Sequence, residues 1–99
     1  MRDAELLGQR FDHPEDLHLM PQERRVYLYV RNGGTGSIKP GRLVERLESG
    51  AYDVQERGAC RHKGGARGLV GALPRIAKEL KSGRCGYVQI QGPCVLRCT

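Results

Sequence analysis

The sequence is poor in the residue types that build a large core. Its 99 residues include no tryptophan, one phenylalanine and four tyrosines, so aromatic side chains make up only 5% of the chain. The core must therefore consist mainly of Leu, Val, Ile and Ala side chains, which suits one small domain. No apolar run approaches the roughly 18 residues of a membrane span, so we predict no membrane partner.

Patterns that would indicate export or a cofactor are also missing. The first residues, Met1-Arg2-Asp3-Ala4-Glu5, do not form a signal-peptide pattern, so we expect a cytoplasmic protein. The four cysteines would stay reduced in that compartment, which disfavours a disulfide framework. We predict no cofactor.

Acidic residues are scarce in the second half of the chain. Residues 1–56 carry eight cations and ten anions, whereas residues 57–99 carry nine cations and only Glu79 as an anion. A segment this basic attracts anions and is typical of proteins that contact phosphates or nucleic acid. The alternative is a solvated surface encoded by a GC-rich genome, since 13 of the 17 cations are arginine.

Apolar periodicity predicts the order of the elements. We divide the chain into an acidic N-terminal arm, residues 1–24, and a single domain, residues 25–99. Alternating residues predict strands over 25–31, 51–56 and 86–91, with a short final strand over 94–98. Helical spacing predicts helices over 39–49 and 66–82, the second kinked at Pro74.

These elements predict an α+β fold. We expect a single small sheet of three to five strands, with two helices packed mainly on one face. A short strand within residues 58–65 would make this a split-βαβ, ferredoxin-like sandwich. If those residues are only loop, the pattern describes a small open α/β sandwich.

Two strand faces carry residues suited to binding nucleic acid. Tyrosine rings stack on bases, arginine pairs with phosphate, and glutamine contacts base edges. Together they would form an open platform, although no Lys/Arg-Gly-Phe/Tyr-Gly/Ala-Phe run is present and no family is assigned. The alternative is that the tyrosines are ordinary strand residues packed under the arm or in a dimer interface. The platform residues are Arg25, Tyr27, Tyr29 and Arg31 on one strand and Tyr87, Gln89 and Gln91 on another.

A glycine-rich, basic stretch over residues 57–68 is the second candidate anion site. It contains Arg61, Lys63 and Arg67, and it directly precedes the predicted helix over 66–82. Backbone amides freed by glycine, next to cations and a helix N-terminus, are suited to a phosphate. Further along that helix, Arg75, Lys78 and Lys81 lie off the apolar stripe and should face solvent. A flexible loop is the commoner explanation for such glycines.

The cysteines and histidines suggest two weaker hypotheses. Cys60 and Arg67 are separated by six residues, one more than the Cys-x5-Arg spacing of cysteine-dependent phosphatases. Cys60-x-His62 and Cys94-x3-Cys98 lack the tight Cys-x2-Cys pairs of zinc sites. We therefore predict no catalytic residue and no metal.

Together these observations favour a small, non-enzymatic binding module. We expect its partner to be nucleic acid or a nucleic-acid-bound protein, and a homo-oligomer is compatible with the sequence. The alternative is a protein inhibitor or regulator, such as a phage-type antagonist of a nucleic-acid enzyme or defence complex. A phosphoryl-transfer enzyme using Cys60 ranks third. The predicted contact residues are Arg25, Tyr27, Tyr29, Arg31, Arg61, Lys63, Arg67, Arg75, Lys78 and Lys81.

Overall fold

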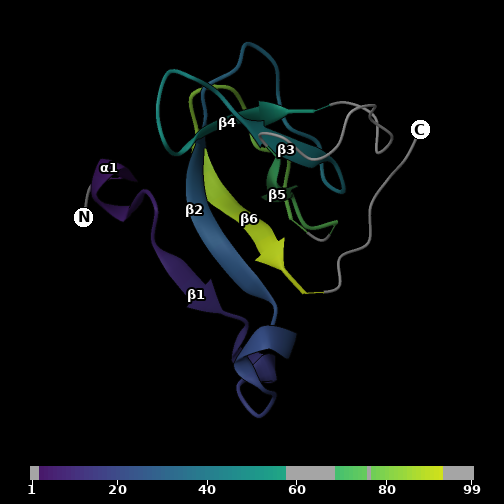
Figure 1. Ribbon diagram of the computed structural model, residues 1–99. Coiled ribbons are helices and arrows are strands. Elements are labelled where there is room, and N and C mark those ends of the chain that lie inside the picture. The colour runs from purple at the N-terminus through teal and green to yellow at the C-terminus, as the bar shows by residue number, and fades with distance from the viewer. Residues whose placement is uncertain (1–2, 58–68, 76, 93–99) are drawn as a thin grey trace.

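A computed structural model describes residues 3–57, 69–75 and 77–92 of the chain (Figure 1). Strands dominate this part of the protein, and its only α-helix is a four-residue turn, α1 (Asp3–Leu6). Two single turns of 3-10 helix, η1 (Pro14–Asp16) and η2 (Pro21–Glu23), lie in the arm. The strands are β1 (Arg10–Asp12), β2 (Val26–Asn32), β3 (Leu43–Arg46), β4 (Asp53–Glu56), β5 (Leu69–Ala72) and β6 (Cys85–Gln91).

Five of these strands close into a barrel. The strand order is β1-β2-β4-β3-β5-β6, and β6 also pairs with β2, which completes the ring. The pairing of β2 with β4 is parallel and the other pairings are antiparallel. The short strand β1 lies outside the ring. It pairs with the first residues of β2, and β4 pairs with the last residues of β2 on the same edge.

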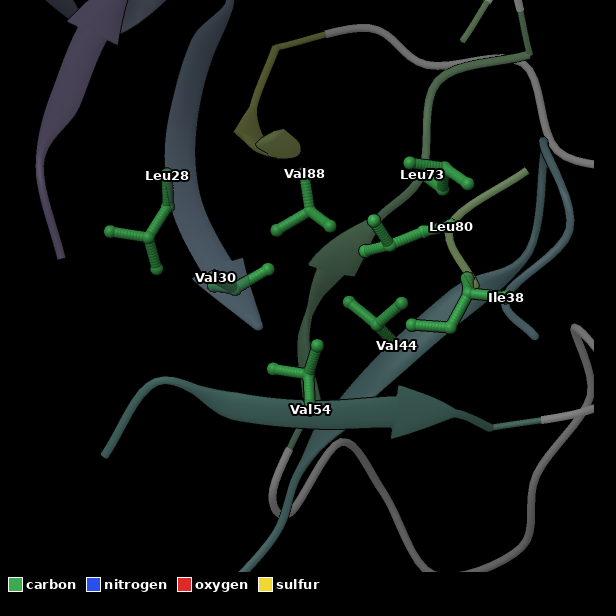
Figure 2. Packing of buried hydrophobic residues seen from close by; sticks show 8 residues of the cluster. All are labelled: Leu28, Val30, Ile38, Val44, Val54, Leu73, Leu80 and Val88. Atoms are coloured by element: carbon green, nitrogen blue, oxygen red, sulfur yellow. The ribbon is translucent and has the colours of Figure 1, made fainter. Parts of the chain in front are cut away.

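Small aliphatic side chains fill the barrel (Figure 2). Val30, Val44, Val54 and Val88 come from four different strands, and each is fully buried. β-branched valines suit this position because they pack well on a pleated surface. Ile38, Leu73 and Leu80, which lie in segments between the strands, complete the core. The full core comprises Leu28, Val30, Ile38, Val44, Val54, Leu73, Leu80 and Val88.

The predicted α+β class is wrong, in both the ferredoxin-like and the open-sandwich form. The segment 39–49 contains β3 instead of a helix, and β3 is hydrogen-bonded between β4 and β5. Its apolar residues Leu43, Val44 and Leu47 satisfy a helical spacing, but so short a helix is only marginally stable alone. Pairing on both edges of β3 therefore decides its conformation.

The second predicted helix, over 66–82, is also wrong. Its described part contains β5 followed by an irregular segment that leads to β6. Gly71 and Pro74 lie inside this stretch, and they cost a helix about 1 and 3 kcal/mol relative to alanine. The apolar residues are buried without a helix, because Leu73 packs in the core and Leu80 forms a β-bridge with Ile38.

The strands with clear alternation are where the sequence predicts them. The prediction over 25–31 corresponds to β2, that over 51–56 to β4, and that over 86–91 to β6. Leu28, Val30 and Val88 point into the core as their alternation predicts, while Val26 and Ile90 are only half-buried. The predicted strand over 94–98 and the strand considered within 58–65 lie outside the described residues.

Close packing of β5 against β6 gives the first prediction. A Cβ atom on Gly71 would overlap the backbone carbonyl oxygen of Gln89, so the strands would have to separate. We expect Gly71→Ala to lower the free energy of unfolding by about 1–3 kcal/mol, measured by urea denaturation. Gly36→Ala is the control, because a Cβ there meets nothing within 4 Å. Equal unfolding midpoints for the two variants would contradict this packing.

Candidate nucleic-acid interface

Four of the five aromatic residues of the chain form one cluster on the outside of the barrel. Phe11 stacks on Tyr27 with ring centroids 5.0 Å apart, and it makes a T-shaped contact with Tyr87 at a centroid distance of 4.7 Å. Tyr29 lies 4.7 Å from Tyr87 on the same surface. Pairs of this kind contribute about 0.5–1.5 kcal/mol each beyond the area they bury. Phe11, Tyr27, Tyr29 and Tyr87 are called the aromatic cluster below.

Strand register explains why these rings meet. Successive side chains of a strand point to opposite faces, so Tyr27 and Tyr29 point outward while Leu28 and Val30 fill the core. Tyr29 is paired with Tyr87 of β6, and Tyr27 is paired with Phe11 of β1. Three neighbouring strands therefore bring their aromatic side chains to one patch of the outer face.

A cleft of about 680 Å³ adjoins the aromatic cluster. The cleft is lined by Phe11, Tyr27 and Tyr87 of the aromatic cluster and by Leu73, Pro74 and Ala77 of the segment that connects β5 to β6. The rim is basic, since it carries Lys78, Lys81 and Arg84, with Glu79 as its only acidic side chain among the described residues. The rim cations are exposed, and they form no ion pair with any described residue.

A buried amide holds the basic rim in place. Asn32 is fully buried at the end of β2, and its Nδ2 donates hydrogen bonds to the carbonyl oxygens of Gly36 and Leu80. Its Oδ1 accepts from the backbone N–H of Gly34. The backbone N–H of Asn32 also donates to the carbonyl oxygen of Arg84. These bonds join the loop after β2 to the segment that carries Lys81 and Arg84.

Two adjacent arginines, Arg24 and Arg25, hold the arm that carries Phe11 and His13. Asp16 accepts hydrogen bonds from Nε, Nη2 and the backbone N–H of Arg25, each 2.8 Å long. Arg24 donates to Asp12 and to the carbonyl oxygens of Leu17 and Leu19. The arm is thereby tied to the start of β2 at several points.

The Asp16 carboxylate is stabilised by this arrangement. The hydrogen bonds from the Arg25 side chain, followed by the one from its backbone, hold the pKa of Asp16 well below its ordinary value of 3.8. The same side-chain bond raises the pKa of the Arg25 guanidinium. Both groups therefore remain charged at neutral pH, and the Arg25 charge is matched within the protein.

The predicted platform residues have different roles in the structure. Tyr27 and Tyr29 belong to the aromatic cluster, whereas Arg25 and Arg31 are engaged in ion pairs. The guanidinium of Arg31 contacts both carboxylate oxygens of Asp53, at 3.0 and 2.8 Å, and these bonds lower the pKa of Asp53. Such bidentate pairing leaves a guanidinium less suited to binding a phosphate.

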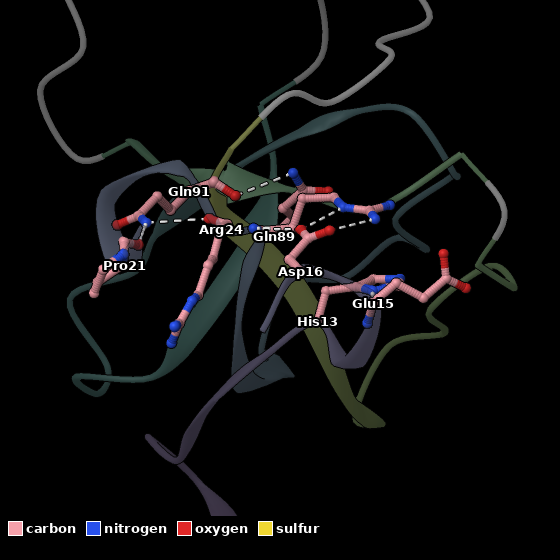
Figure 3. A network of polar contacts seen from close by, with 8 residues as sticks. His13, Glu15, Asp16, Pro21, Arg24, Gln89 and Gln91 are labelled. Atoms are coloured by element: carbon pink, nitrogen blue, oxygen red, sulfur yellow. Dashed lines mark hydrogen bonds and ion pairs between the residues drawn. The ribbon is translucent and has the colours of Figure 1, made fainter. Parts of the chain in front are cut away.

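The two predicted platform glutamines make internal contacts. The prediction that Gln89 is exposed is wrong, because only 6% of it is accessible, and its Nε2 donates to the carbonyl oxygen of Gln91. The Nε2 of Gln91 donates to the carbonyl oxygens of Pro21 and Arg24, which anchors the arm to β6 (Figure 3).

Three of the basic residues predicted from the second half lie close together in the chain. Lys78 and Lys81 are on the rim of the cleft, and Arg75 is exposed. Arg61, Lys63 and Arg67 lie outside the described residues, so their role in binding stays a prediction. The candidate nucleophile Cys60 lies outside them as well.

Sequence reasoning missed part of this site. Phe11, His13 and Arg84 line the cleft but were not predicted as contact residues. Phe11 lies in a three-residue strand, which is too short to produce a recognisable alternating pattern. Its one signal is that it is the only phenylalanine in a chain with few aromatic residues.

Metal binding finds no support in the described part of the chain, where no three His, Cys, Asp or Glu side chains are grouped to hold an ion. Cys85 is a half-buried cysteine in its thiol form. Cys60, His62, Cys94 and Cys98 fall outside the described residues, so their ability to bind zinc is untested. No described helix is long and apolar enough to cross a membrane.

Comparisons with protein-family models, with curated proteins and with solved structures found no match to this chain. The chemistry of the cleft itself is therefore the basis on which a function is inferred.

The second prediction concerns the attachment of the arm. We expect Asp16→Asn to lower the Tm for two reasons. The amide has only one oxygen to accept the three hydrogen bonds from Arg25, and it lacks the negative charge that strengthens them. A carboxylate whose pKa is lowered by folding stabilises the folded state fully above its ordinary pKa, and this stabilisation is lost as the pH falls. The Tm difference from wild type should thus be constant above about pH 4 and narrow below it.

Thermal melts followed by circular dichroism across this pH range will measure the difference. Glu23→Gln, which removes an exposed carboxylate from the same arm, is the matched control and should leave the Tm nearly unchanged. A Tm difference for Asp16→Asn that stays the same down to about pH 2 would contradict the role of its charge.

Proposed function

We propose that this chain is a non-enzymatic module that binds single-stranded nucleic acid in the cleft beside the aromatic cluster. The observation that carries the proposal is that three aromatic side chains, Phe11, Tyr27 and Tyr87, line the same cleft as three exposed cations. Proteins that bind single strands combine these two features, because the rings stack on bases and the cations follow the backbone.

The exposure of the rings supports stacking. Phe11 is 42% exposed and Tyr87 is 39% exposed, so both offer surface to a ligand although they also touch each other. Tyr29 is only 8% exposed, and its ring packs against the ring of Tyr87. Phe11 and Tyr87 are therefore the residues that we expect to stack on bases.

The charge of the rim supports phosphate binding. Lys78, Lys81 and Arg84 lie on the rim without an ion pair to a described residue, so binding a phosphate requires no internal pair to break. The net charge of +6 would also attract a polyanion from a distance. Arg25 and Arg31 are left out of the proposed contacts because Asp16 and Asp53 already neutralise them.

The apolar walls favour a single strand over a duplex. In a double helix the bases are stacked on one another and only their edges are accessible in the grooves. An unpaired base has two free faces, and it can enter between Tyr87 and the wall of the cleft that carries Pro74 and Ala77. A duplex would offer its phosphates to the rim alone.

The third prediction tests stacking. We expect Tyr87→Ala to weaken binding of a fluorescent single-stranded oligonucleotide, RNA or DNA, by roughly 5- to 150-fold, as the loss of one stacked base implies. Tyr87→Phe should retain most of the affinity because the ring remains. Tyr52→Ala is the matched control, since Tyr52 is 40% exposed and lies outside the aromatic cluster.

Fluorescence anisotropy, on variants shown to be folded by circular dichroism, is the measurement. Equal affinities for wild type and Tyr87→Ala would contradict stacking in the cleft. If wild type binds no oligonucleotide even at low salt, the protein-inhibitor hypothesis becomes the better one, with an apolar peptide segment in the cleft.

The fourth prediction tests phosphate contacts by their salt dependence. We expect Lys81→Ala and Arg84→Ala each to reduce the slope of log affinity against log salt by about 0.7 for a single strand. The loss should be similar for different sequences, because phosphates carry no base information. Arg46→Ala, an exposed cation on β3 outside the cleft, should leave the slope unchanged. Unaltered slopes in both rim variants would exclude these two residues as phosphate contacts.

A further inference from the structure

The outer edge of β1 pairs with no described strand. β1 is the first strand in the sheet order, and its only partner there is β2 (Figure 1). The carbonyl oxygen of Gln9 accepts from the N–H of Tyr29, and the N–H of His13 donates to the carbonyl oxygen of Arg25, so the hydrogen-bonded positions of β1 against β2 fall at residues 9, 11 and 13. Backbone groups alternate along an antiparallel strand, so those of Arg10 and Asp12 point outward.

The side chains on this edge are complementary to a second copy of themselves. β1 reads Arg10-Phe11-Asp12, with opposite charges on either side of one aromatic residue. If two such strands pair antiparallel with Phe11 opposite Phe11, each Arg10 lies opposite Asp12 of the other copy. Opposite charges placed directly across a strand pair stabilise it, whereas like charges destabilise it.

We propose that two copies of this chain pair through their β1 strands to form a two-fold symmetric dimer. The pairing gives both outward-facing residues their backbone partners, because Arg10 and Asp12 would exchange N–H···O bonds across the symmetry axis. Asp12 contacts Arg24 through Oδ2, at 3.2 Å, which leaves Oδ1 for Arg10 of the second copy. The dimer does not depend on the proposed function, since no ligand takes part in it.

The proposed β1–β1 register also brings the aromatic clusters of the two copies together. Phe11 projects to the face of β1 that carries the aromatic cluster, opposite to the face of Arg10 and Asp12. In the proposed pairing the two Phe11 residues form a non-hydrogen-bonded pair, in which side chains lie close together. The two aromatic clusters would then meet at the axis as one continuous aromatic surface.

A second copy is favoured over the other explanation for a charged edge. Charges on an edge strand commonly prevent pairing, and a short strand serves the same purpose. Charges of a single sign would repel an identical strand, but β1 carries one of each sign in a self-complementary order. The short strand limits the strength of the dimer, so its formation should depend on protein concentration.

Analytical ultracentrifugation over a concentration series, without nucleic acid, tests the proposal. We expect wild type to approach twice the monomer mass as concentration rises. Arg10→Asp places two like charges opposite each other, as does Asp12→Lys, so each variant alone should stay monomeric. An equimolar mixture should form a heterodimer, because the acidic β1 strand of the Arg10→Asp variant then faces the basic β1 strand of the Asp12→Lys variant.

Two further variants control for misfolding and for general charge effects. Arg10→Pro removes an outward-facing N–H together with the Arg10 charge, but no hydrogen bond to β2, so it should abolish the dimer while the barrel melts as in wild type. Arg46→Asp reverses an exposed charge on β3 and should leave the dimer intact. A wild type that is monomeric at millimolar concentration, or a dimer that survives Arg10→Pro, would overturn the proposal.

Discussion

Strand β2 pairs with three neighbouring strands, and these pairings position both the barrel core and the aromatic cluster. One edge of β2 pairs with β6, and the other is shared by β1 and β4. Because side chains alternate, β2 supplies Leu28 and Val30 to the core and Tyr27 and Tyr29 to the outer face. A shift of one residue in its register would exchange these two sets, so the barrel core and the aromatic cluster are formed together.

Polar networks hold both the arm that carries Phe11 and the irregular segment that carries the basic rim to the barrel. The arm that carries Phe11 is attached through Asp16, Arg24 and Arg25, while the basic rim is attached through Asn32. Binding residues are commonly found on loops positioned by a rigid scaffold. A buried polar group that is fully hydrogen-bonded gives such a loop one defined position, which hydrophobic contact alone does not ensure.

The positive charge of the chain is divided between structural and accessible cations. Arg25 and Arg31 are bound by carboxylates, whereas Lys78, Lys81 and Arg84 are exposed on the rim. Charge counting treats these residues as equal, although only the second set offers its charge to a ligand without breaking an internal pair. The distribution of carboxylates in space therefore matters more for the proposed function than the net charge of +6.

Strands whose apolar alternation is complete within their own segment were predictable from the sequence. β2 and β6 alternate over seven residues each, so their positions and the outward direction of Tyr27 and Tyr29 could be predicted. Leu43, Val44 and Leu47 fit a helix as well as a strand, and only pairing of β3 with β4 and β5 decided between them. Likewise, Phe11 joins the cleft through pairing with the distant Tyr27, because a three-residue strand is specified by its partner and not by its own sequence.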